Sequence, residues 1–188
     1  MVTQVTPYWA GRIAEAELGE ALPRRWAHSQ GVAARAEEIG RLLHKDANLL
    51  TAAATLHDVG YAPRLAITGF HPLDGARFLR DEHRADARLT RLVANHSFAL
   101  LEAEERGLRE ELATEFPLLD DPLLVDALVY CDMTTTPDGG RTTARERVAE
   151  IVGRYGPDGV VGRFIQRAAP EIFSSVEKVE AALVAQPR

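Results

Sequence analysis

Cysteine and lysine are nearly absent from this sequence of 188 residues. The single cysteine, Cys131, excludes an internal disulfide framework and is typical of a reducing compartment, so we expect a cytoplasmic protein. Lysine occurs only at Lys45 and Lys178, so arginine supplies nearly all of the positive charge, and arginine suits bidentate phosphate contacts. The net charge is -6 and no long basic stripe is present, which argues against binding to a nucleic-acid polymer.

Long hydrophobic runs are also missing. No apolar run approaches the roughly 18 residues of a membrane span, and no signal peptide is expected at the N-terminus. Apolar and polar residues do not alternate over the length of a strand, so a β-sheet is not expected. The hydrophobic share of 46% and the charged share of 27% are those of a folded globular protein.

Apolar residues recur with helical spacing along almost the whole chain. We therefore predict an all-α fold, with residues 1–188 forming one helical-bundle domain and residues 1–10 loosely held. The predicted helices cover residues 23–46, 46–60, 70–82, 84–97, 100–116, 120–133, 144–156, 158–169 and 170–186.

Local signals mark several of the predicted helix ends. N-caps are expected at Asp46, Asp121 and Thr143, and Thr143 is expected to form a capping box with Glu146. Gly60 is expected to stop the helix that begins at Asp46.

Three predicted helices carry a polar side chain on the face that should belong to the core. These residues are His28, His96 and Asp132. A single histidine on an apolar face is more often a core residue with a satisfied hydrogen bond than a metal ligand. An unpaired carboxylate that faces a core is costly, so Asp132 needs a cation or strong hydrogen-bond donors.

His57 and Asp58 stand side by side in the last turn of another predicted helix. Neighbouring side chains on a helix point roughly 100° apart, so a cation beside the helix end could meet both. The alternative is a His–Asp pair that only caps the helix. Helical bundles build metal sites from side chains on facing helices, and the joint placement favours such a site. His44 and His83 lie in polar segments and are expected at the surface.

The order His28, His57–Asp58, Asp132 resembles the signature of the HD-domain superfamily of metal-dependent phosphohydrolases. The resemblance covers roughly residues 24–135. It implies an all-α fold of the HD type with the metal at the centre of the bundle, against which the C-terminal helices over 142–186 would pack.

Two further histidines match a narrower pattern. His71 begins an "HxxxGA" segment in "FHPLDGARFL", and His96 lies in "LVANHSF". This arrangement is similar to those of symmetrical diadenosine tetraphosphate hydrolases, HD-type cyclic-dinucleotide phosphodiesterases and mixed-valent di-iron oxygenases such as inositol oxygenase. It implies a site for one or two metal ions, with Asp58 bridging two, and with the ligands His28, His57, Asp58, His71, His96 and Asp132.

The sequence departs from these relatives around the signature. The lysine that many HD hydrolases place after the His–Asp pair is missing, and Tyr61 and Arg64 follow instead. The threonine-rich segment of the diadenosine tetraphosphate hydrolases and the "GYP" motif of the cyclic-dinucleotide enzymes are missing after His96. The metal ligands are unaffected by these differences, whereas the substrate is left open.

The function implied is hydrolysis of a phosphomonoester or phosphodiester, on a nucleotide or related small molecule, by a metal-activated water at His57 and Asp58. Arg64 and Arg77 are candidates for binding the phosphate, with a solvated surface position as the alternative. Imidazole and carboxylate ligands favour Mn or Fe, and Zn, Co, Ni and Mg are possible. The alternatives are a di-iron oxygenase, a non-catalytic nucleotide-binding regulatory domain and a metal-free helical protein. The oligomeric state is left open.

Overall fold

The computed structural model describes residues 5–186, and this part of the chain is helical and contains no named β-strand. The predicted all-α class is confirmed. The α-helices are α1 (Pro7–Leu18), α2 (Pro23–Ile39), α3 (Ala47–Leu56), α4 (His71–Asp81), α5 (Ala87–Asn95), α6 (Ala99–Glu105), α7 (Arg109–Glu115), α8 (Pro122–Met133), α9 (Ala144–Tyr155) and α10 (Val160–Ala185). Short 3-10 helices join some of them: η1 (Gly40–Leu42), η2 (His44–Asp46), η3 (Val59–Tyr61) and η4 (His96–Phe98).

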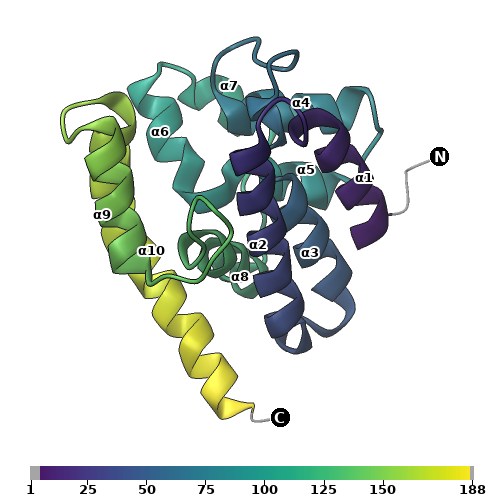
Figure 1. Ribbon diagram of the computed structural model, residues 1–188, viewed down its shortest axis with the longest axis vertical. Helices are drawn as coiled ribbons and strands as arrows, with labels where there is room; N and C mark the ends of the chain where they lie inside the picture. The colour runs from purple at the N-terminus through teal and green to yellow at the C-terminus, as the bar shows by residue number, and fades with distance from the viewer. Residues whose placement is uncertain (1–4, 187–188) are drawn as a thin grey trace.

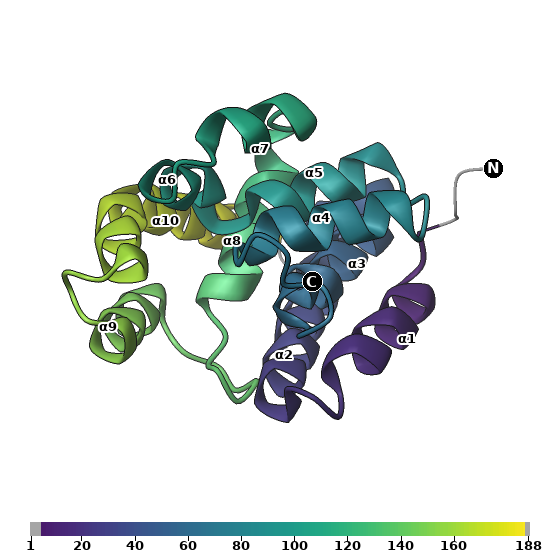
Figure 2. The ribbon, with the colours of Figure 1, turned by 90° about the horizontal axis from the view of Figure 1, so that it is seen from above.

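Helix α8 lies at the centre of the bundle (Figures 1 and 2). It packs against α2 and α3 on one side and against α10 on the other. Helix α1 covers α3 from outside, α4 pairs with α5, and α9 pairs with α10. None of the helices within residues 5–186 combines the length and the hydropathy that crossing a membrane requires.

One continuous cluster of buried apolar side chains runs from α1 to α10. Its largest fully buried members include Leu50 of α3 and Leu124 and Leu128 of α8. Each such side chain contributes about 2 kcal/mol by leaving water. The metal-ligand candidates lie within this cluster, so their positions are fixed by close packing.

Two of the predicted N-caps are confirmed in full. Asp121 accepts a hydrogen bond from the Leu124 amide at 3.3 Å, and Thr143 and Glu146 form the expected capping box. Asp46 occupies the N-cap position of α3, but its side chain makes no capping bond.

The prediction that Gly60 stops a helix is wrong. Helix α3 ends at Leu56, and Gly60 lies within η3.

The predicted helix over residues 100–116 is divided at Gly107. Gly107 adopts a φ of 72°, and its amide and that of Leu108 bond to the carbonyls of Glu104 and Ala103 at 3.1 and 2.8 Å. These two bonds form a Schellman motif, which ends α6. Glycine adopts this backbone conformation without strain, so α7 starts in a new direction.

The two helices predicted at the C-terminus form one helix, α10, with Pro170 inside it. Proline removes one backbone hydrogen bond, here the one to the carbonyl of Gln166. Pro170 and Gln166 are both exposed, so water can bind that carbonyl and the helix continues.

The expectation that residues 1–10 are loosely held is wrong for its helical part, and residues 1–4 lie outside the described chain. Thr6 caps α1 by accepting a hydrogen bond from the Trp9 amide at 3.2 Å. Ala10 and Leu18 of this helix are fully buried. The sequence therefore did contain the signals for α1, which are a Thr–Pro helix start followed by apolar residues with helical spacing.

Candidate metal centre

Six side chains from five helices converge at the end of α8. His28 comes from the middle of α2 and Asp132 from the last turn of α8, and the others lie at the ends of α3, α4 and α5. The structure thus brings together all six residues that the sequence suggested as ligands: His28, His57, Asp58, His71, His96 and Asp132.

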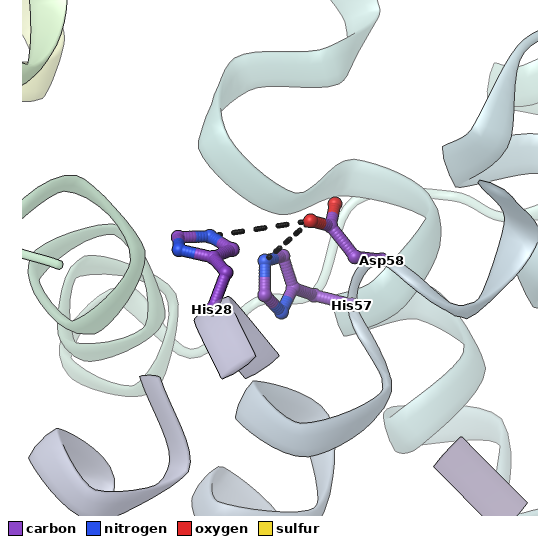
Figure 3. A group of neighbouring side chains, drawn as sticks. All are labelled: His28, His57 and Asp58. Atoms are coloured by element: carbon purple, nitrogen blue, oxygen red, sulfur yellow. Dashed lines mark ion pairs between the residues drawn. The ribbon is translucent and has the colours of Figure 1, made fainter. Parts of the chain in front are cut away.

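The first group consists of His28, His57 and Asp58 (Figure 3). The Nε2 atoms of His28 and His57 lie 4.0 and 3.5 Å from the same oxygen, Oδ2 of Asp58. Oδ1 of Asp132 lies 3.1 Å from His28 Nε2 and 3.8 Å from His57 Nε2. Two imidazoles and two carboxylates therefore face one point.

The second group consists of Asp58, His71 and His96. His71 Nε2 lies 3.4 Å from Asp58 Oδ1 and 3.2 Å from His96 Nε2. Asp58 belongs to both groups and turns a different oxygen toward each. A carboxylate placed in this way can bridge two ions.

The spacing of these atoms suits metal ions. Ligands that bind one octahedral ion at about 2.1 Å lie roughly 3.0 Å apart when adjacent and about 4.2 Å apart when opposite. The four distances given above for the two groups fall between 3.2 and 4.0 Å, and all ligand atoms of each group lie within 4.8 Å of one another. In addition, His57 Nε2 is fully buried and has no hydrogen-bond partner, which is costly unless a cation binds it.

The orientation of three imidazoles is fixed by backbone carbonyls, which leaves Nε2 free to bind a cation. The Nδ1 contacts are His28 with Thr136 O at 2.9 Å, His57 with Ala54 O at 2.7 Å, and His96 with Val93 O at 2.6 Å.

An unusual backbone turn follows His96. Ser97 and Phe98 both adopt positive φ angles, 48° and 64°, which cost non-glycine residues about 1 kcal/mol or more each. The turn places the Ser97 hydroxyl against Asp132, to which it donates a hydrogen bond of 2.5 Å. This bond holds Oδ2 and leaves Oδ1 of Asp132 directed at His28 and His57.

Gly60 allows α4 to approach the His57–Asp58 segment. A Cβ atom on Gly60 would lie 2.0 Å from the carbonyl oxygen of His71 and 2.6 Å from the amide nitrogen of Gly75. Only glycine permits this contact, which brings His71 to Asp58.

A second glycine contact ties the loop after α8 to α2. A Cβ atom on Gly31 would lie 2.4 Å from the carbonyl oxygen of Gly139, and one on Gly139 would lie 2.4 Å from that of Ala27. The loop also supplies the Thr136 carbonyl that orients His28. The packing of this loop on α2 therefore also holds the carbonyl that orients His28, one of the candidate ligands.

Charges within the centre favour cation binding. Burial lowers the pKa values of His57 and His71, so both imidazoles are neutral near pH 7. Burial opposes ionisation of Asp58, but His57, which is charged at the acid pH where Asp58 would titrate, and Arg25 outweigh it and hold the pKa of Asp58 well below the usual range. Neutral imidazoles and ionised carboxylates are the forms that bind metal.

A family model for the HD domain matches residues 25–131, more than half of the chain. The chain belongs to the HD domain family. The predicted resemblance is thereby confirmed, and with it membership of a superfamily of metal-dependent phosphohydrolases. Neither a curated protein nor a solved structure matches the chain. We call residues 25–131 the HD segment.

Within the HD segment, Arg25, Tyr61 and His71 form a stacked row. The Arg25 guanidinium lies 3.7 Å from the centre of the Tyr61 ring, and that ring stacks on the His71 imidazole at 3.9 Å. Arg25 also donates a hydrogen bond of 2.8 Å to Asp58 Oδ2. The row therefore contacts two members of the second ligand group of this HD protein, His71 and Asp58.

A cavity of about 80 Å³ opens from the candidate metal centre toward α9 and α10. Arg147, Arg154 and Tyr155 of α9 and Phe164 of α10 line it together with all of the candidate ligands except His57. The helices that follow the HD segment thus form the wall opposite the metal ligands.

Arg64 and Arg77 do not line this cavity. Arg64 pairs with Glu17 and Glu82, and Arg77 pairs with Glu115, so the structure gives both arginines partners elsewhere. The arginines that line the cavity of the HD protein are Arg25, Arg147 and Arg154.

The two histidines expected at the surface lie away from the metal centre. His44 is exposed. His83 is half-buried, with its ring 4.8 Å from that of Phe78 and 6.0 Å from that of Trp9.

The sequence contained signals for two residues that were missed. Arg25 precedes His28 by three positions, so the two share a helix face. Arg147 lies between Ala144 and Ile151 on the buried stripe of α9, the kind of placement that pointed to Asp132. Ser97 had no such signal, because its role depends on the backbone turn.

Proposed function

We propose that this HD protein is a phosphohydrolase that cleaves a phosphate ester of a nucleotide or a related small molecule. The observation that carries the proposal is the placement of Asp58, with one oxygen toward His28 and His57 and the other toward His71. This arrangement supports two divalent ions, for which the ligand chemistry favours Mn or Fe.

The proposed ligands are His28, His57, Asp58 and Asp132 for one ion and Asp58, His71 and His96 for the other. Divalent ions bound here would activate a water molecule and neutralise charge on the phosphate. Asp58 connects the two groups, and with its neighbour His57 it forms the core of the proposed catalytic centre.

The protein's own residues have three further tasks. The Nδ1 bonds to backbone carbonyls keep the imidazoles aimed at the ions. Arg25 and Arg147 line the cavity, where their guanidinium groups can bind phosphate oxygens. The buried setting excludes most water, which strengthens these electrostatic contacts.

Metal analysis and a substrate panel test the proposal. The purified protein is expected to hold about two transition-metal ions per chain and to release phosphate from at least one ester in the panel. His57→Ala should abolish that release and reduce the metal content, while the far-ultraviolet circular dichroism stays that of a helical protein.

His44→Asn serves as the matched control. His44 is exposed and has a positive φ of 45°, a conformation that asparagine tolerates. This variant should keep wild-type metal content and activity. A fully metal-loaded protein that cleaves nothing across a broad panel would refute the hydrolase.

A mixed-valent di-iron oxygenase would use the same six ligands. It would require iron specifically, consume dioxygen and show the colour of mixed-valent iron. The arginines of the cavity, Arg25, Arg147 and Arg154, favour an anionic phosphate substrate instead. Oxygen uptake in the presence of iron, measured beside phosphate release, discriminates between the two.

A further inference from the structure

A cleft lined by four arginines adjoins the metal centre. Its volume is about 270 Å³. Its charged or titratable lining residues are Arg24, Arg25, Arg147, Arg154 and His28, and the remaining lining residues are Ala21, Leu22, Pro23 and Pro137. None of these lining residues carries a carboxylate, although the whole chain has a net charge of -6. A cleft of one charge sign attracts ligands of the opposite sign.

The cleft is continuous with the cavity over the metal centre. Arg25, His28, Arg147 and Arg154 line both. Arg25 also bonds to Asp58, so it stands where the cleft meets the metal ligands. A ligand bound at the metal centre can therefore extend into the arginine cleft.

Arg147 provides an independent sign of a missing anionic partner. It is only 5% exposed, and its Nε has no hydrogen-bond partner. Its Nη1 bonds to Glu150, so one edge of the guanidinium is satisfied and the other is not. A buried guanidinium nitrogen without a partner is costly, and a phosphate oxygen would satisfy it.

The carboxylates that balance these arginines stand behind them. Arg24 pairs with Asp138, and Arg154 pairs with Glu150 at 3.3 Å. Neither carboxylate lines the cleft. The residues that line the cleft are therefore basic or uncharged.

We propose that the arginine cleft is a second anion subsite and that the substrate carries a second phosphate group besides the one attacked at the metal centre. This inference rests on the proposed hydrolase and narrows its substrate class to compounds with two or more phosphates. Arg147 and Arg154 bind the second phosphate, and Arg25 stands between the two subsites.

Binding of two phosphate probes tests the proposal without any turnover. Isothermal titration calorimetry compares inorganic phosphate with methylenediphosphonate, which resists hydrolysis, on metal-loaded protein freed of unbound metal. The wild type is expected to bind the diphosphonate at least about tenfold more tightly, since the second group gains charge-assisted hydrogen bonds. Arg154→Gln should weaken diphosphonate binding by about tenfold and phosphate binding by less than about twofold.

Two further variants control for loss of the fold. Arg147→Lys keeps a positive charge at the buried position but cannot reproduce the guanidinium contacts, so it should also weaken diphosphonate binding. Arg145→Gln makes the same change as Arg154→Gln on the same helix, at an exposed residue that lines neither cavity, and should leave both affinities unchanged.

The outcomes separate this inference from the proposed hydrolase. Equal affinities for the two probes in the wild type, or an equal loss in Arg145→Gln, would overturn the second subsite. If the diphosphonate preference and its loss in Arg154→Gln are found without hydrolysis of any ester, the subsite stands and the hydrolase falls. If an ester is hydrolysed but the diphosphonate is not preferred over phosphate, the hydrolase stands and the second subsite falls.

Discussion

The HD segment and the two helices α9 and α10 contribute different things to the same cavity. The HD segment carries five of the six proposed ligands, and Asp132 follows its last residue directly. Helices α9 and α10 carry Arg147, Arg154 and Phe164, which line the opposite wall. Apart from Arg25, residues that would hold the ions and residues that would select the substrate thus come from separate stretches of chain, so either set can change while the other is kept.

The largest effects are expected from single ligands within the HD segment. His28→Ala and His71→Ala each remove a ligand from a different group, so each should lower the metal content from about two ions per chain toward one. Phosphate release should fall by a hundredfold or more, on the order of the loss of a main charge-stabilising contact. Elemental analysis and a phosphate assay measure both. A variant that retains both ions would contradict the assigned grouping.

Ser97→Ala is expected to have an intermediate effect. The hydroxyl bonds to Asp132 at 2.5 Å, and such outer contacts typically contribute about ten- to a hundredfold to metal affinity. Competition with a chelator should show metal binding weakened by about tenfold at unchanged stoichiometry. Unchanged affinity would mean that Ser97 only shapes the backbone turn.

A change in the C-terminal wall should alter substrate preference alone. Val161 of α10 lines the cavity, and Val161→Phe narrows it. We expect the KM for bulky esters to rise roughly fivefold, equivalent to about 1 kcal/mol, while the metal content is unchanged. Val184→Phe on the same helix is the control, since Val184 is 81% exposed. Loss of metal from Val161→Phe would contradict the assignment of ion binding to the HD segment and of substrate selection to α9 and α10.

The smallest effect is expected from Glu115→Gln, which removes the ion pair between Glu115 and Arg77. Arg77 holds the pKa of Glu115 at about 2, below the ordinary 4.5. The ionised pair therefore stabilises the fold above about pH 4.5, and this contribution is lost as the pH falls toward 2. Glu115→Gln should lower the free energy of unfolding by about 0.5–1 kcal/mol at pH 7. Denaturant unfolding at both ends of this range checks that the difference from wild type vanishes in acid and that activity at pH 7 is kept.

Three of the six candidate ligands could be singled out from the sequence because each breaks a local pattern, whereas His71 was suggested only by the family resemblance. His28, His96 and Asp132 interrupt apolar stripes, and burial of polar groups demands partners wherever it occurs. Helix ends with their own capping chemistry, such as Asp121 and Thr143, could be predicted in the same way.

The substrate wall could not be predicted because it depends on how distant helices pack. Arg64 and Arg77 were chosen for closeness in sequence to the ligands, yet their side chains pair with glutamates elsewhere. Helix α9 reaches the cavity only through its packing on α10. The C-terminal segment was predicted as two helices that meet at Pro170, but it forms one. Proline breaks helices on average, and this exposed position tolerates it.

The contact between Gly31 and Gly139 makes two distant positions depend on one another. With backbones this close, neither can acquire a side chain unless the loop over residues 134–143 and helix α2 separate. Anyone who transplants that loop into another helical scaffold must therefore carry across a matching glycine on the facing helix. In natural descendants the pair should change together or persist together.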